Sequence, residues 1–178
     1  MMEAKRTAWQ NSKWRLDIYE LEKPDGERVE TAVVRHSGAV VLVPITATGK
    51  VLMLRQYRLP LDQIILEIPA GTRESKEEPW LECAQRELRE ETGFRADNFV
   101  DLGILWPIPG SSDEEQKIFL ATGLIPDPLP QDFDEQIEVV EMELDELCAM
   151  ALDGRMRDTK SGISLLRVKH YLDSEQLP

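Results

Sequence analysis

The stretch from residue 86 to residue 94 combines a helical pattern with a high density of acidic side chains. It reads Arg-Glu-Leu-Arg-Glu-Glu-Thr-Gly-Phe. On a helix, Glu87 and Glu91 are four residues apart and share one face, with Glu90 beside them. Like charges at that spacing destabilise a helix, and a bound hard divalent cation is the simplest compensation. The segment therefore predicts a metal-binding helix that ends at Gly93.

The same helix is predicted to begin near Pro79, because proline suits the first helical turn. Leu81, Ala84 and Leu88 recur at helical spacing and predict the stripe that packs on the core. Cys83 lies beside them and is interpreted as a packing residue and not as a nucleophile. The predicted helix thus carries both a packing stripe and an acidic cluster.

Strand patterns on both sides of this helix predict an α/β fold, with a mixed sheet between helices in an α/β/α sandwich. Residues 39–45 form a nearly continuous apolar run, which indicates a buried central strand. Gly71 is expected to open a loop, and residues 124–134, rich in proline and acid, predict a second surface loop. Further strands are predicted over residues 14–21, 29–34, 51–57, 99–105, 117–122 and 137–142, and helices over 143–152 and 159–173.

The composition is that of a globular protein, with 42% hydrophobic and 31% charged residues in a chain of 178. A net charge of −13 argues against a nucleic-acid partner, but an acidic site still binds phosphates when Mg²⁺ bridges the two sets of charges. No apolar run is long enough to span a bilayer, and the N-terminus lacks the apolar stretch of a signal peptide. No membrane partner and a cytoplasmic location are therefore expected.

The cysteines and histidines offer no catalytic or metal motif of their own. Cys83 and Cys148 are far apart and form no Cys-x-x-Cys, which argues against a zinc ribbon. His36 and His170 lack a partner that would indicate a triad, and both are interpreted as structural or surface residues.

Taken together, residues 71–94 resemble the Nudix box, written G-x5-E-x7-R-E-U-x-E-E-x-G-U with U a bulky apolar residue. Glu78 has the correct spacing to Arg86, and Phe94 fills the final apolar position. Gly71 lies one residue too far from Glu78, which indicates one extra residue in the loop before the helix. The resemblance implies that Arg86 orients the acidic side chains and that Glu78 braces the loop.

The resemblance also implies a metal-dependent hydrolase with the Nudix fold. Mg²⁺ is the expected cofactor, with Mn²⁺ as a substitute, because carboxylate oxygens are suitable ligands for both ions. Glu87 and Glu91 are expected to be metal ligands together with the carbonyl of Ala70, and Glu90 an accessory ligand or a base. The alternative is a solvated acidic helix face, in which Arg86 and Glu90 form an ordinary ion pair.

Sequences on either side of the box narrow the substrate class. Residues 67–71, Glu-Ile-Pro-Ala-Gly, are typical of pyrophosphatases that act on ADP-ribose and related nucleoside diphosphate sugars. Residues 55–58 resemble the Arg-Gln-x-Arg strand of these enzymes, and Pro109 lies sixteen residues after Gly93, as it does in them. Residues 154–160 are similar to the segment that leads into their last helix. The resemblance implies that the substrate contacts Arg55, Arg58, Glu67, Pro109 and Trp14.

An acidic stretch at residues 132–138 is expected to supply the general base, because the family has a loop glutamate that approaches the attacking water. Glu135 is the preferred candidate, and Asp132, Asp134 and Glu138 stay open. An ordinary solvated loop explains any one of these residues nearly as well.

The N-terminal residues are expected to form an antiparallel β extension at 1–38, ahead of a Nudix hydrolase domain at 39–178. In dimeric members of the family, strands of this kind exchange between subunits, which implies a homodimer. Aromatic residues there stack on adenine, and Trp14 is the candidate. Core packing or burial in a dimer interface explains Trp9 and Trp14 at least as well.

The expected reaction is hydrolysis of ADP-ribose to AMP and ribose 5-phosphate. One alternative is another nucleoside diphosphate sugar or dinucleotide, such as GDP-mannose, ADP-glucose or NADH. Residues 106–109 faintly resemble the Pro-Trp-Pro motif of NADH pyrophosphatases, but those enzymes carry a cysteine zinc ribbon. A second alternative is a Nudix-fold sensor that binds ADP-ribose without cleaving it. The intact set of three glutamates argues against such a sensor.

Overall fold

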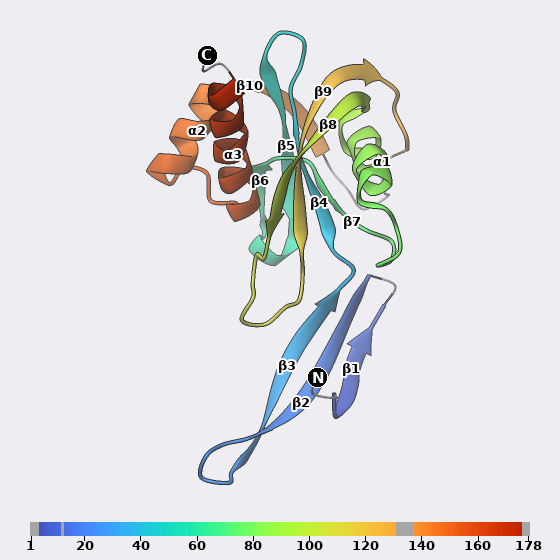
Figure 1. Cartoon of the computed structure of the whole chain (residues 1–178), viewed down its shortest axis with the longest axis vertical. Coiled ribbons are helices and arrows are strands. Elements are labelled where there is room, and N and C mark those ends of the chain that lie inside the picture. Colours follow the sequence, from blue (N-terminus) through green and yellow to red (C-terminus); the bar gives the residue numbers. More distant parts are fainter. Residues whose placement is uncertain (1–3, 12, 131–136, 176–178) are drawn as a thin grey trace.

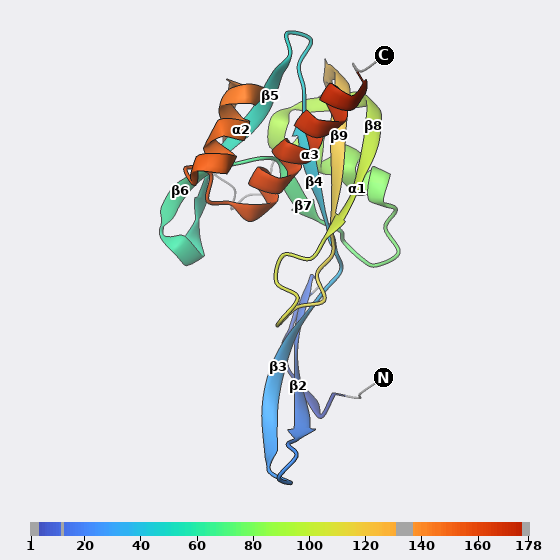
Figure 2. The same ribbon diagram turned by 60° about the vertical axis from the view of Figure 1, so that its left-hand side comes forward.

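The computed structural model describes residues 4–11, 13–130 and 137–175 of the chain (Figure 1). A body of sheets and helices occupies one end of the molecule, and a narrow N-terminal sheet projects from it (Figures 1 and 2). The mixed α/β body and the β extension confirm the predicted fold class.

Strand β4 (Ala39–Pro44) forms the centre of the body, because all of its residues are buried. It pairs in parallel with β9 (Gln116–Pro126) and antiparallel with β7 (Ala70–Thr72). Strand β8 (Phe94–Leu105) pairs antiparallel with β9 and completes a four-stranded sheet of order β7-β4-β9-β8. The continuous apolar run predicted as a central strand is therefore confirmed.

A second sheet is antiparallel and has the order β10-β5-β6. It contains β10 (Ile137–Glu143), β5 (Lys50–Arg58) and β6 (Gln63–Glu67), and a short 3₁₀ helix, η1 (Leu59–Leu61), joins β5 to β6. Only two residues separate β6 from β7, so the end of this sheet lies next to the edge of the central one.

Helices cover both faces of the central sheet (Figures 1 and 2). Helix α1 (Trp80–Thr92) lies on one side, and α2 (Leu144–Asp153) and α3 (Thr159–Glu175) lie on the other. Alternate side chains of β4 pack into the two layers, Val40 and Leu42 toward α1 and Val41 and Val43 toward α2 and α3. Among the described residues, no helix has the length and apolar character needed to cross a bilayer.

Helix α1 begins after Pro79 and ends at Gly93, whose φ of 79° suits a glycine. Ala84 and Leu88 are fully buried, as predicted, and Cys83 is buried beside them. The prediction for Leu81 is wrong, because its side chain is 54% exposed. Trp80, in the same turn, packs against this core cluster instead.

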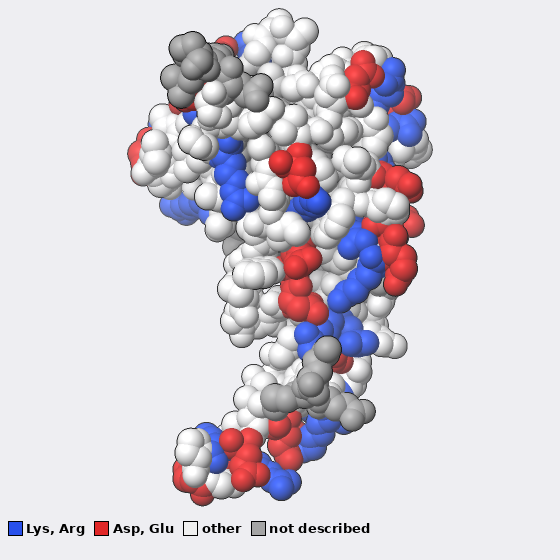
Figure 3. Space-filling view, in the orientation of Figure 1, with Lys and Arg blue, Asp and Glu red and all other residues white. Residues whose placement is uncertain are grey.

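The N-terminal sheet contains β1 (Arg6–Gln10), β2 (Trp14–Glu22) and β3 (Arg28–His36), all antiparallel. Acidic and basic side chains alternate over its surface (Figure 3), and ion pairs such as Lys5–Glu20 at 2.8 Å cross between strands. At its base, the N–H of Val34 donates to the carbonyl of Ser111 at 2.8 Å. The loop between β8 and β9 therefore anchors the extension to the body.

Three strands were not predicted, namely β1, β6 and β7. Strand β7 contains Gly71, which was expected to open a loop, and it forms because its three residues pair with β4. The predicted loop at 124–134 is wrong at its start, because residues 124–126 continue β9 and pair with β8. Strand β7 forms by pairing with the distant strand β4, whereas β1 and β6 pair with their sequence neighbours β2 and β5. Local propensity shows none of these pairings.

Candidate active site

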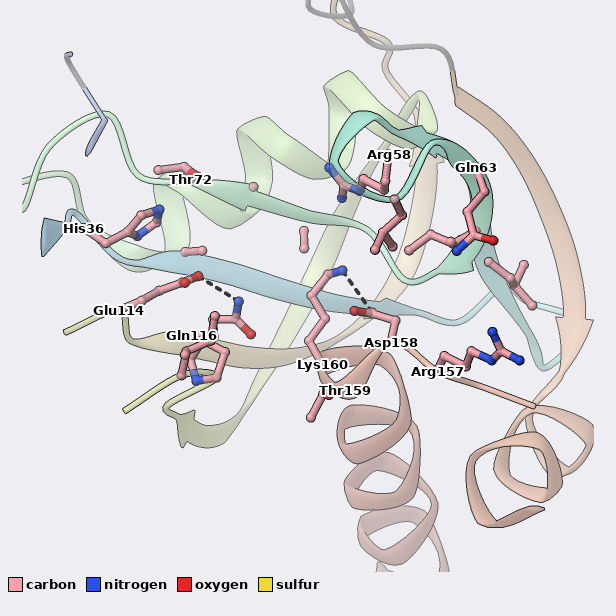
Figure 4. A pocket seen from close by; sticks show the side chains of 18 of the residues that line it. His36, Arg58, Gln63, Thr72, Glu114, Gln116, Arg157, Asp158, Thr159 and Lys160 are labelled. Carbon is pink, nitrogen blue, oxygen red and sulfur yellow. Dashed lines mark hydrogen bonds and ion pairs between the residues drawn. The ribbon is translucent and has the colours of Figure 1, made fainter. Parts of the chain in front are cut away.

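A cavity of about 640 Å³ lies where β7, β4 and β9 meet the start of α3 and the loop between β8 and β9. The sheet register places Thr72, Ala39 and Gln116 side by side along one wall. Figure 4 shows His36, Glu114 and Gln116 toward one end of this cavity and Arg58, Arg157 and Lys160 toward the other. The cavity thus has a cationic end and a neutral-to-acidic end.

The acidic face of α1 packs directly behind the cavity strand β7. The carboxylate of Glu87 lies so close to Gly71 that a Cβ there would be 1.7 Å from Glu87 Cδ. The backbone N–H of Ala70 donates to Glu91 Oε2 at 2.8 Å. Ala70 and Gly71 both line the cavity, so this packing brings two of the three predicted carboxylates to its wall.

Arg86 holds the acidic side chains together. Its Nη1 donates to Glu87 Oε1 at 2.7 Å and to Glu90 Oε2 at 3.0 Å, and its Nη2 lies 3.2 Å from Glu78 Oε1. Burial lowers the pKa of Arg86, but the charge of Glu87 and their hydrogen bond outweigh this and leave the pKa above its ordinary value. One guanidinium among three carboxylates leaves the cluster net negative.

Glu78 also braces the loop before the helix. Its Oε2 accepts a hydrogen bond from the N–H of Glu74 at 2.6 Å. Glu78 and not Glu77 therefore contacts Arg86, which agrees with the spacing chosen from the sequence.

The donor set of this cluster fits a hard divalent cation, because all of its side-chain donors are carboxylate oxygens. In the part of the chain that the structure describes, no three His, Cys, Asp or Glu side chains already surround a point where a metal would sit. Arg86 instead forms ion pairs with Glu87 and Glu90.

A second buried carboxylate, Glu67, orients the cationic end of the cavity. Glu67 is fully buried and accepts from Arg58 Nε at 2.7 Å and from Arg58 Nη2 at 2.9 Å. Lys160 Nζ also donates to Glu67, and it reaches Asp158 Oδ2 at 2.9 Å. Burial lowers the pKa of Arg58, but the hydrogen bonds to Glu67 and the charges of Glu67, Glu91 and Asp158 together leave this pKa above its ordinary value. The paired geometry fixes the Arg58 guanidinium at the cavity wall.

The start of α3 is tied to this network through Ser161. Its Oγ accepts from the N–H of Ile68 at 2.9 Å and donates to Asp158 Oδ2. Sequence analysis did not identify Lys160 or Ser161 as site residues. The signal available for them was the similarity of residues 154–160 to the segment that leads into the last helix of the family.

The remaining predicted residues lie in different surroundings. Trp14 lines the cavity and is 46% exposed. Arg55 is exposed and lies 3.5 Å from Glu138 across β5 and β10, and it is not among the cavity residues. Pro109 is exposed, and its neighbours Pro107 and Ile108 line the cavity in its place. Glu135, Asp132 and Asp134 lie outside the described residues.

His36 and Cys83 are buried near the site. The Nδ1 of His36 accepts from the N–H of Gly38 at 3.0 Å, and its ring meets Trp14 edge to face at 5.1 Å. Burial raises the pKa of the Cys83 thiol to about 12, which agrees with a packing role.

Comparison with known proteins identifies the class to which this fold and acidic site belong. Residues 34–162 match the family model described as NUDIX domain. Over 167 residues the chain is 35% identical to a Bacillus subtilis protein named ADP-ribose pyrophosphatase, covering 90% of each chain. It is 36% identical over 153 residues to a Bacillus methanolicus protein named methanol dehydrogenase activator, covering 85% of this chain and 82% of the other.

A crystal structure of an ADP compounds hydrolase has the same fold, with a TM-score of 0.80. The two chains are 23% identical, and the match covers 96% of this chain and 92% of the other. The chain therefore belongs to the Nudix family, and the resemblance stated from its sequence is confirmed.

Proposed function

We propose that this protein is a metal-dependent hydrolase that adds water across the diphosphate of ADP-ribose to give AMP and ribose 5-phosphate. The observation that carries the proposal is the contact of an acidic helix with a cavity strand. Glu87 packs against Gly71, and Glu91 accepts from the N–H of Ala70. Membership of the Nudix family and the relative from Bacillus subtilis support the reaction and the substrate.

The metal would be Mg²⁺, with Mn²⁺ as a substitute, held by Glu87, Glu91 and the carbonyl of Ala70. Glu90 would be an accessory ligand or a base. When bound, such an ion neutralises the diphosphate and acts as a Lewis acid. Arg86 lets the carboxylates stay close together before the ion binds, because its charge offsets part of their repulsion.

Arg58 would bind phosphate oxygens at the cationic end of the cavity, a role that suits a guanidinium. Glu67 would act as its positioning residue, since both of its oxygens are engaged by Arg58. Arg55, Trp14 and Pro109 stay proposed substrate contacts. Of these, Trp14 has the strongest support, because its ring lines the cavity.

Glu135 stays the proposed general base, with Glu90 as the second candidate. The support for Glu135 is its place in the sequence, two residues before Ile137, which pairs with Gln56 on the strand that carries Arg55 and Arg58. Replacement of Glu135 by Gln should lower kcat and change KM little, because a base acts in the chemical step.

A panel of nucleotide substrates with Mg²⁺ separates the proposed substrate from its rivals. ADP-ribose, GDP-mannose, ADP-glucose and NADH are compared by kcat/KM, with AMP release followed for the adenine compounds. We expect the highest kcat/KM with ADP-ribose. A higher value with any of the other three would contradict the substrate assignment, and binding of ADP-ribose without turnover would favour the sensor.

The metal assignment is tested by Glu91→Gln. The variant keeps an oxygen that can accept from Ala70, so the fold should persist while the negative charge is lost. We expect kcat to fall by roughly a hundredfold or more. Glu82→Gln is the matched control on the same helix, because Glu82 is exposed. Undiminished turnover in Glu91→Gln would refute the assignment.

We also propose that residues 1–38 form a unit that joins two copies of the chain into a homodimer. Support comes from the narrow sheet that β1, β2 and β3 form outside the body (Figures 1 and 2). Trp9 on β1 is 56% exposed, which leaves a large aromatic surface available for a partner.

A further inference from the structure

Gln116 carries a buried hydrogen-bond acceptor at the wall of the cavity. Its Oε1 has no hydrogen-bond partner among the described residues, although the residue is only 9% exposed. Buried polar atoms are nearly always paired, so an unpaired acceptor on a residue that lines a cavity calls for a donor from outside the described residues, a bound molecule or a water. Gln116 lines the cavity that the acidic cluster adjoins.

The orientation of the Gln116 amide is fixed by a neighbouring carboxylate. Its Nε2 donates to Glu114 Oε1 at 2.8 Å. Because a carboxylate only accepts, the nitrogen must face Glu114 and the oxygen must be the unpaired atom. Gln116 therefore presents an acceptor and not a donor.

A complementary donor lies at the same end of the cavity. Nδ1 of His36 accepts from the N–H of Gly38, so a neutral ring carries its proton on Nε2. Burial lowers the pKa of His36, which favours the neutral ring. His36 and Gln116 both line the cavity (Figure 4), and Trp14 is a further lining residue. Besides the Glu114 carboxylate, this end thus combines the acceptor of Gln116, the donor of His36 and the aromatic residue Trp14.

The sheet register sets the distance of this end from the acidic cluster. Ala39 pairs with Thr72 on one side and with Gln116 on the other, so two strand spacings, about 10 Å, separate the backbones of Thr72 and Gln116. Thr72 directly follows Gly71, against which Glu87 packs. A nucleoside attached to a diphosphate at Gly71 is long enough to reach Gln116.

We propose that Gln116 is a specificity-determining residue that accepts a hydrogen bond from the nucleoside half of the substrate. The donor is an N–H or O–H group, supplied by the amine of the base or by the 2′-hydroxyl of the adjoining ribose. Arg58, toward the opposite end of the cavity, then faces the phosphate oxygens of the diphosphate. This inference rests on the proposed hydrolysis of ADP-ribose. It adds that the enzyme recognises the nucleoside half of the substrate.

The test compares the wild type with Gln116→Met, which keeps the length of the side chain and removes the acceptor. We expect KM for ADP-ribose to rise roughly tenfold with little change in kcat, as for the loss of one substrate hydrogen bond. Gln56→Met is the matched control. Gln56 Oε1 is also buried without a partner among the described residues, but Gln56 does not line the cavity. Its KM should equal that of the wild type.

Two substrate analogues identify the donor. IDP-ribose lacks the amine of the base, and an ADP-ribose analogue deoxygenated at the 2′ position of the adenosine lacks one hydroxyl. The analogue that has lost the donor should be cleaved with the same kcat/KM by the wild type and by Gln116→Met. Equal kcat/KM of the wild type and Gln116→Met on either analogue supports the inference.

An effect of Gln116→Met that is absent, or equal for all three substrates, would overturn the inference while leaving the proposed function intact. If the wild type cleaves none of them, the proposed function fails instead. Calorimetric binding of AMP, which contains both candidate donors, then tests Gln116 alone. Weaker binding by Gln116→Met than by Gln56→Met supports the inference, and equal binding rejects it.

Discussion

A glycine at position 71 is required by the carboxylate that packs against it. A Cβ at this position would lie 1.7 Å from Glu87 Cδ, which is far inside van der Waals distance. The glycine is one residue further from Glu78 than the Nudix pattern places it, yet it still lies against the acidic helix. The extra residue is accommodated in the loop at 73–79, and the contact between β7 and α1 is kept.

Gly71→Ala is expected to displace the Glu87 carboxylate from the cavity wall. Because the displaced group is the end of a flexible side chain, the fold should persist. We expect apparent affinity for Mg²⁺ and turnover both to fall, by about 10–100-fold. Metal titrations of activity measure this, with Gly110→Ala as control, since a Cβ at Gly110 meets no atom within 4 Å. Wild-type metal affinity in Gly71→Ala would contradict the packing argument.

Helix α3 contributes to the site through its first turn, which holds the end of β6. The hydroxyl of Ser161 accepts a hydrogen bond from the N–H of Ile68, and Lys160 donates one to Glu67. Glu67 in turn positions Arg58. The helix therefore links the cationic end of the cavity to the core. Its remaining turns pack through Leu165 and Val168, which are both fully buried.

Lys160→Met is expected to leave fully buried Glu67 with Arg58 as its single cationic partner. We expect a loss of about 1–3 kcal/mol in the free energy of unfolding. We also expect a higher KM, because Arg58 alone then neutralises Glu67 and attracts the substrate phosphates less strongly. Urea denaturation and steady-state kinetics measure the two effects. Lys169→Met on the same helix removes an exposed ion pair with Asp145, and its stability should stay within about 0.5 kcal/mol of the wild type. Equal effects of the two variants would exclude a special role for Lys160.

At the scale of the whole molecule, the N-terminal sheet and the body share the cavity. Trp14 and His36 come from the extension, whereas Thr72, Gln116 and Lys160 come from the body. Hydrogen bonds at the base of the extension, such as that from the N–H of His36 to Asp113 at 2.9 Å, hold the two parts together. The proposed dimer would therefore be built on an element that also forms part of the site.

The dimer proposal predicts a solution mass of twice the 20.4 kDa chain. Light scattering coupled to gel filtration measures this mass. Trp9→Glu should shift the protein toward the monomer, because a charge replaces an exposed aromatic side chain on β1. A monomeric wild type at micromolar concentration would contradict the proposal.

Local patterns in the sequence determined the acidic helix, the central strand and the family. Glu87, Glu90 and Glu91 fall on one side of α1 because helical spacing alone places them there. Such patterns did not predict strand β7, because three residues are too few to show the alternation of a strand. They form a strand only by pairing with β4. The tertiary structure also decided the partners of Glu67, because Lys160 is 93 residues away in sequence. It likewise placed Gln116 in the cavity wall and left its Oε1 without a partner among the described residues. The physical reason is that spacing along one helix or strand fixes a face, whereas contacts between distant residues follow from sheet register and layer packing.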